Sequence, residues 1–170
     1  MSKQKLIAIA GPTASGKTAL AIALCKRIGG EVVSCDSMMI YKGMDIGTAK
    51  PTVAEMAGVR HHMLDVAEPG ENYSAAQFRD AARAVIADIA GRGAWPVLCG
   101  GTGLYIDAIT RDMSFASAPS DAQLRARLEA ELEDVGPVRM HARLAQVDPV
   151  TAARLHVNDT RRVIRALEIY

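Results

Sequence analysis

The apolar residues of this chain gather in short runs separated by glycine, proline and polar residues, a pattern typical of buried strands. These runs occupy residues 6–10, 31–35, 59–66 and 95–99. Stretches of good helix formers lie between them at 19–25 and 75–90, and the second opens with a capping box at Ser74 and Gln77. Strands that alternate with helices predict an α/β fold in which helices cover both faces of a parallel sheet.

The pattern changes in the last third of the chain, where no strand is predicted. A helix rich in arginine and glutamate is expected from a capping box at Ser120, with a break at Gly136 and further helices beyond it. The sequence therefore predicts an α/β core over 1–115 and a helical segment over 116–170. Because the last helix reaches the end of the chain without a terminating signal, the pattern favours a C-terminal truncation.

A phosphate-binding loop follows the first predicted strand and precedes the first predicted helix, as in a P-loop NTPase-like fold. The residues predicted to bind phosphate are Gly11, Pro12, Thr13, Ala14, Ser15, Gly16, Lys17 and Thr18. Backbone N–H groups and the helix dipole attract phosphate oxygens, Lys17 adds a positive charge, and the Thr18 hydroxyl is a ligand for Mg²⁺. The loop does not reveal which bond next to the phosphates is broken.

Two polar residues are expected at the same edge of the sheet. Asp36 directly follows the second strand, where its carboxylate can hold Mg²⁺, accept a proton from a nucleophile, or simply cap a turn. Thr102 lies in a glycine-rich turn after the fourth apolar run, where its hydroxyl can hydrogen-bond a phosphate oxygen or the acceptor. The alternative is that the glycines only allow a turn with positive φ angles. That run does not end in the acidic residue usual in nucleotide hydrolases, which argues against an ATPase.

Composition and charge exclude several classes of protein. Lysine and arginine number 20 against 19 acidic residues, so the bulk charge gives no case for nucleic-acid binding. Cys25, Cys35 and Cys99 lie in apolar runs and are expected to be buried thiols. His61 and His62 are adjacent on a predicted strand and point to opposite faces, which argues against a shared zinc site. With no apolar run long enough to cross a membrane, we expect a cytoplasmic protein.

Arginines cluster on the last predicted helix, where Arg161, Arg162 and Arg165 lie within five residues of one another. Spacings of three and four residues place such side chains on one helix face. The cluster can grip a nucleic-acid backbone, or it can form a solvated surface paired with Asp159 and Glu168. The pattern by itself leaves both interpretations open.

Several longer motifs occur in order along the chain. They are residues 11–18, 36–37, 40–51, 61–65, 73–78 and 100–105. Together they resemble the bacterial tRNA dimethylallyltransferases, also called tRNA isopentenyltransferases, and the resemblance extends over essentially the whole chain. The long run at 40–51 makes this resemblance far more specific than the phosphate-binding loop alone.

The resemblance implies transfer of a dimethylallyl group from dimethylallyl pyrophosphate to N6 of adenosine 37, in tRNAs that read codons beginning with U. It implies that the loop holds the donor's pyrophosphate with Mg²⁺, that Asp36 is the general base, and that Lys17 and Thr102 take part in catalysis. It also implies a set of tRNA contacts and a monomer that needs no protein partner. The implied tRNA contacts are Asp36, Ser37, Met38, Met39, Thr102, Arg125, Arg161, Arg162, Val163, Ile164 and Arg165.

This chain departs from the family pattern at one motif and leaves other functions open. The family commonly reads Asn-Asp-Pro-Gln-Arg where residues 158–162 carry Thr160 and Arg161 in place of proline and glutamine. An adenylate isopentenyltransferase shares the donor chemistry but uses a free nucleotide as acceptor. A small-molecule kinase with a phosphate-binding loop, and a non-enzymatic tRNA-binding domain, are more distant alternatives.

Overall fold

The computed structural model describes residues 5–111 and 121–170, which belong to two compact units spanning 1–114 and 115–170. Each unit has its own apolar core. None of the helices in the described ranges is both long and apolar enough to cross a membrane.

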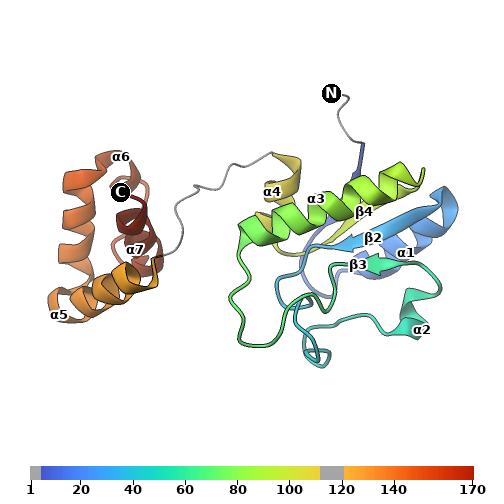
Figure 1. The fold of residues 1–170 in the computed structure, drawn as a ribbon, viewed down its shortest axis with the longest axis horizontal. Helices are drawn as coiled ribbons and strands as arrows, with labels where there is room; N and C mark the ends of the chain where they lie inside the picture. The colour runs from blue at the N-terminus through green and yellow to red at the C-terminus, as the bar shows by residue number, and fades with distance from the viewer. Residues whose placement is uncertain (1–4, 112–120) are drawn as a thin grey trace. The chain divides into compact units, whose positions relative to one another are not determined.

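The first unit is built on a parallel sheet of four strands in the order β1-β4-β2-β3. The strands are β1 (Ile7–Ala10), β2 (Gly30–Ser34), β3 (His61–His62) and β4 (Trp95–Gly100). The helices are α1 (Lys17–Ile28), α2 (Val53–Met56), α3 (Ala75–Gly91) and α4 (Gly103–Thr110). The expected α/β class and parallel sheet are confirmed (Figure 1).

Helices cover both faces of the sheet because side chains alternate along each strand. Val32 packs with Ala21 and Cys25 of α1 on one face, whereas Val33 packs with Phe78 of α3 on the other. The Phe78 ring stacks on Tyr105 of α4 with a centroid separation of 3.8 Å, which joins α3 to α4. Figure 1 shows α3 lying across its face of the sheet.

The apolar stretch at 59–66 forms a much shorter strand than its sequence predicts. Only His61–His62 pairs with β2, because Met63 and Asp65 adopt left-handed φ angles of 61° and 54°. A left-handed residue cannot continue an extended strand, so the chain turns away after His62.

The second unit consists of α5 (Ala122–Val147), α6 (Pro149–Ala152) and α7 (Thr160–Ile169). The expected break in the first helix is confirmed at Gly136, where φ is 77° and ψ is 168°, next to Pro137. The helix begins differently from the prediction, because Asp121 caps it through bonds to the Gln123 and Leu124 N–H groups. Ser120 of the predicted capping box lies outside the described residues.

The two central strands approach so closely at their carboxyl ends that only glycine fits at residue 100. A Cβ atom added to Gly100 would lie 2.2 Å from the carbonyl oxygen of Cys35. Two hydrogen bonds hold this approach, from Cys35 N–H to Cys99 O at 2.8 Å and from Thr102 N–H to Cys35 O at 3.1 Å.

Gly100→Ala should therefore destabilise the first unit by about 2 kcal/mol, because the backbone on both sides must move apart. The measurement is urea unfolding followed by the fluorescence of Trp95, the only tryptophan. Gly91→Ala is the matched control, since a Cβ there meets nothing within 4 Å and the residue ends a helix. Equal stabilities for the two variants would contradict the steric argument.

Candidate active site

A pocket of about 470 Å³ opens in the first unit at the carboxyl edge of the sheet. The phosphate-binding loop and the start of α1 form one side of it, and Ser34, Asp36 and Gly100 contribute from the ends of β2 and β4. The side next to β3, called the far wall below, is made by Met39, Thr48, Ala49, Pro51 and Leu64. The pocket thus brings together the predicted phosphate site and the predicted base.

The loop carries the backbone geometry that anion binding requires. Ala14 and Gly16 have φ angles of 64° and 80°, and Gly16 precedes α1 without any side-chain cap. The N–H groups in the first turn of a helix have no partner within the helix, and here no side chain takes them. A phosphate group placed in this loop would meet those N–H groups and the positive end of the α1 dipole.

The ammonium of Lys17 lies over the loop itself. Its Nζ atom donates to the Pro12 carbonyl oxygen and lies 3.4 Å from the Ser15 hydroxyl oxygen. Ser15 in turn donates to the same carbonyl at 2.8 Å. The positive charge is therefore held where phosphate oxygens would bind. Thr18, the expected Mg²⁺ ligand, also lines the pocket.

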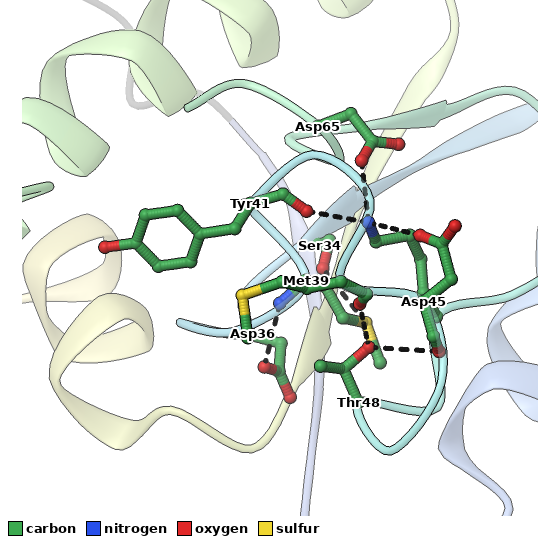
Figure 2. Close-up of polar contacts among 9 residues, drawn as sticks. Ser34, Asp36, Met39, Tyr41, Asp45, Thr48 and Asp65 are labelled. Atoms are coloured by element: carbon green, nitrogen blue, oxygen red, sulfur yellow. Dashed lines mark hydrogen bonds and ion pairs between the residues drawn. The ribbon is translucent and has the colours of Figure 1, made fainter. Parts of the chain in front are cut away.

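Asp36 caps a turn, which is one of the roles that the sequence left open, and its action on Mg²⁺ or on a proton stays a prediction. Its Oδ1 atom accepts hydrogen bonds from the N–H groups of Met38 at 2.9 Å and Met39 at 3.4 Å, which caps the turn. Figure 2 shows the bond from Met39. Its Oδ2 atom receives no hydrogen bond from the described part of the chain, and the residue lines the pocket. One oxygen fixes the carboxylate, and the other is left to act on a ligand.

Thr102 is placed beside Asp36 but is tied to the protein. Its hydroxyl oxygen accepts from the Ser37 N–H group at 3.0 Å and donates to the Ser37 hydroxyl at 3.2 Å. The residue is not among those that line the pocket. Its hydroxyl therefore joins the turn after β4 to the turn that carries Asp36. Direct contact of Thr102 with a substrate stays a prediction.

Lys50 holds the far wall and was not singled out from the sequence. Its side chain is 6% exposed, and its ammonium donates to Tyr41 O at 2.8 Å, Asp45 Oδ1 at 2.7 Å and Asp65 Oδ1 at 2.6 Å. In Figure 2, dashed lines run from the labelled Tyr41, Asp45 and Asp65 to one shared nitrogen atom. Thr48 closes the same turn by donating to Met44 O at 2.5 Å. Tyr41 and Asp45 belong to the same segment as Lys50, whereas Asp65 comes from the loop after β3, so only the fold reveals the whole cluster.

The two adjacent histidines point to opposite faces of β3, as expected. His61 lines the pocket with Nδ1 2.9 Å from Val59 O, and burial lowers the pKa of its ring. Its Nε2 atom is buried without a hydrogen-bond partner in the described residues. His62 turns the other way and lies 2.6 Å from Glu31 Oε2.

In the second unit, three of the four arginines expected to contact tRNA have acidic partners: Arg125, Arg162 and Arg165. Glu168 has a side chain that is only 2% exposed, and Arg165 Nη1 donates to it at 2.9 Å. Arg125 Nε lies 3.2 Å from its other oxygen as an ion pair without hydrogen-bond geometry. A buried carboxylate requires such cations. Arg125 joins α5 to α7 through Glu168, whereas Arg165 pairs with Glu168 within α7. Arg162 pairs with Asp159 at 3.0 Å and remains 75% exposed.

Two of the expected tRNA contacts require a correction. Val163 and Ile164 are 1% and 4% exposed and pack in the core of the second unit. Their side chains hold α7 against α5 and do not face an RNA. Arg161 and Arg162 are the most exposed arginines of this helix, and their contact with tRNA stays a prediction, as does that of the partly exposed Arg165.

Comparison with known proteins agrees with a phosphate-loop transferase of prenyl groups. The family model described as "IPP transferase" matches residues 39–170, and a second, described as "Isopentenyl transferase", matches residues 4–69. The first match spans more than half of the chain. The chain belongs to the IPP transferase family.

Curated relatives and solved structures carry related names. The tRNA dimethylallyltransferase of Shouchella clausii is 51% identical over 99% of this chain and 54% of its own length. That of Anaeromyxobacter sp. strain Fw109-5 is 56% identical over 97% of this chain and 55% of its own length. This chain spans about half the length of the curated relatives it matches.

Two solved structures extend the likeness to the fold. The tRNA isopentenylpyrophosphate transferase of Bacillus halodurans is 49% identical over 98% of this chain and 55% of its own, with a TM-score of 0.67. A eukaryotic dimethylallyltransferase described as acting on tRNA is 34% identical over 99% of this chain and 42% of its own, with a TM-score of 0.83.

An ion cluster of Glu31, Arg92 and His62 at the amino end of β2 predicts that stability depends on pH. Arg92 donates to both oxygens of Glu31 and, against the effect of burial, holds the pKa of that carboxyl at about 2, with a further contribution from His62. In the unfolded chain a glutamate takes up its proton near pH 4.5. The stability from this carboxylate is thus complete above pH 4.5 and is lost as the pH falls toward 2.

Glu31→Gln should make the acid loss of stability shallower in that window. The measurement is the free energy of unfolding from urea titrations of Trp95 fluorescence at pH values between 2 and 6. Above pH 4.5 the variant should be less stable than the wild type, and the two curves should converge toward pH 2. Parallel curves over the whole range would show that this ion cluster does not contribute to the acid dependence.

Proposed function

We propose that this chain is the donor-binding and catalytic part of a tRNA dimethylallyltransferase. The reaction transfers a dimethylallyl group from dimethylallyl pyrophosphate to N6 of adenosine 37, in tRNAs that read codons beginning with U. The products are N6-isopentenyladenosine and pyrophosphate. The observation that carries the proposal is one pocket lined by both the phosphate-binding loop and the Asp36 carboxylate. We also propose that the protein works in the cytoplasm, where tRNA is used.

The loop residues bind and stabilise the leaving group. As the allylic C–O bond breaks, negative charge grows on the pyrophosphate. The uncapped N–H groups at the start of α1 and the Lys17 ammonium stabilise this charge. Mg²⁺, when bound, would neutralise part of that charge. Thr18 supplies the hydroxyl expected to hold it, and pyrophosphate and water supply the other oxygens that such an ion needs.

Asp36 acts on the acceptor. The exocyclic amine of adenine is a weak nucleophile, because its lone pair is delocalised into the ring. Asp36 Oδ2 orients this amine and takes its proton as the C–N bond forms, while Oδ1 keeps the carboxylate fixed by capping the turn. The target base must leave the anticodon-loop stack to reach the pocket. Thr102 supports this step by holding Ser37, the residue next to the general base Asp36.

The acceptor is the point on which the nearest alternative differs. An adenylate isopentenyltransferase would use the same donor with a free nucleotide. Relatives named tRNA dimethylallyltransferase match this chain along 97–99% of its length, including the helical unit, which favours tRNA. Arg161 and Arg162 are the exposed cations that we assign to the tRNA backbone.

Nucleoside mass spectrometry tests the proposal directly. Unmodified tRNA or AMP would be incubated with dimethylallyl pyrophosphate, Mg²⁺, and this chain extended by the C-terminal half of the Shouchella clausii relative. The unaltered relative serves as the positive control. Prenyl on adenosine 37 supports the proposal, whereas prenyl on AMP supports the alternative. A lack of transfer to either acceptor would contradict both.

Asp36→Asn isolates the proton-transfer role, because the amide oxygen can still cap the turn while the base is lost. We expect the single-turnover rate to fall by about 10²- to 10⁴-fold, with the affinities for tRNA and donor within about twofold of the wild type. Asp80→Asn is the control, since this carboxylate lies exposed on α3 beside Arg79. A loss of tRNA affinity as large as the loss of rate would make Asp36 a recognition residue instead.

A further inference from the structure

The far wall of the pocket consists of two loops that are separated along the chain by α2 and β3. Thr48, Ala49 and Pro51 belong to the segment before α2, whereas Leu64 follows β3. Neither loop is part of a helix or strand, so the shape of this wall depends on contacts between side chains and backbone. Lys50 makes such contacts to both loops, through Asp45 on one side and Asp65 on the other.

Backbone strain is concentrated around this lysine. Ala49 and Asp65 adopt left-handed φ angles of 56° and 54°, and neither is a glycine. A non-glycine residue in this conformation is strained and persists only where its surroundings hold it. Ala49 is adjacent to Lys50, and Asp65 is one of its partners and directly follows Leu64. The strained positions therefore coincide with the residues that the lysine restrains and with the wall they form.

The charges make Lys50 hard to replace. Three oxygens take the three N–H groups of its ammonium, so its donors are fully used. Burial lowers the pKa of this group, but the bonds to Asp45 and Asp65 outweigh burial and raise it. Without the cation, two carboxylates would face one another across the gap and repel. Both are partly exposed, at 64% and 47%, so they would separate into water and carry the loops apart.

We propose that Lys50 is a positioning residue that sets the far wall against the dimethylallyl part of the donor. The inference rests on the proposed function, because it takes dimethylallyl pyrophosphate as the ligand. The pyrophosphate part binds at the loop after β1, which Lys50 does not touch. Lys50 therefore controls affinity for the prenyl group and leaves the affinity for pyrophosphate itself unchanged.

Isothermal titration of this chain with dimethylallyl pyrophosphate and with inorganic pyrophosphate, both in Mg²⁺, separates the two parts of the ligand. Lys50→Met keeps most of the length of the side chain and removes its charge. It should weaken binding of the prenyl donor by about tenfold or more and change binding of inorganic pyrophosphate by less than about twofold.

Lys42→Met is the matched control. Lys42 belongs to the same segment, but it is 54% exposed, pairs with Glu68 on the surface and does not line the pocket. Both affinities should stay within about twofold of the wild type, as expected for an exposed ion pair. Circular dichroism and urea unfolding would verify that each variant is folded. If Lys50→Met does not fold, Asp65→Asn keeps one acceptor and should weaken the prenyl donor alone by about threefold.

The outcomes distinguish this role from the proposed function. A wild-type chain that binds inorganic pyrophosphate as tightly as the prenyl donor would overturn the prenyl site, and the positioning role with it. If the wild type prefers the prenyl donor, a Lys50→Met variant that binds both ligands normally overturns the positioning role alone. Equal weakening of both ligands would also overturn it, since Lys50 would then support the whole unit.

Discussion

The close approach of β2 and β4 at their carboxyl ends is the constraint on which the site depends. The strand order places β4 between β1, which carries the phosphate-binding loop, and β2, which carries Asp36. Adjacent strands lie about 4.8 Å apart, so the loop and the carboxylate begin roughly 10 Å from each other. Cys99 and Gly100, at the end of β4, line the pocket together with the loop and Asp36. In the proposed reaction this pocket holds a ligand that has a pyrophosphate at one end and a reacting carbon near the other.

The same approach also orients the catalytic groups. The backbone of Cys35 is bonded to Cys99 and Thr102, and the Thr102 hydroxyl is bonded to Ser37. Asp36 lies between Cys35 and Ser37, so the turn after β4 restrains it from both sides. In the proposed reaction this restraint keeps one carboxylate oxygen directed at the amine. The role that the structure supports for Thr102 is thus to position the base.

Much of the fold and part of the site can be predicted from the sequence, for reasons that differ between elements. The phosphate-binding loop and the parallel sheet follow from local signals, namely apolar runs, helix formers and glycine spacing. The strand at 59–66 was predicted too long, because the left-handed turns at Met63 and Asp65 have no glycine to mark them. Lys50 went unnoticed because its partners, at residues 41, 45 and 65, meet only in the folded chain.

In the helical unit, too, the roles of charged residues depend on partners that the sequence does not reveal. A run of arginines was expected to bind tRNA, yet two of the expected arginines support the buried Glu168, and the run also includes core residues. Charge alone could not separate these roles, because Arg125 of α5 meets Glu168 of α7 only in the folded chain. The chain belongs to the IPP transferase family, and its pocket is where the proposed reaction would hold the donor.

The most direct measurement is an NMR titration that locates the donor-binding site. The ¹⁵N-labelled chain would be titrated with dimethylallyl pyrophosphate and Mg²⁺ while the backbone amide shifts are recorded. The largest shifts are expected at the N–H groups of residues 13–18, with smaller ones in the turn at 36–39 and in the far wall. Shifts that leave residues 13–18 unchanged would contradict the assignment of this pocket to a prenyl pyrophosphate.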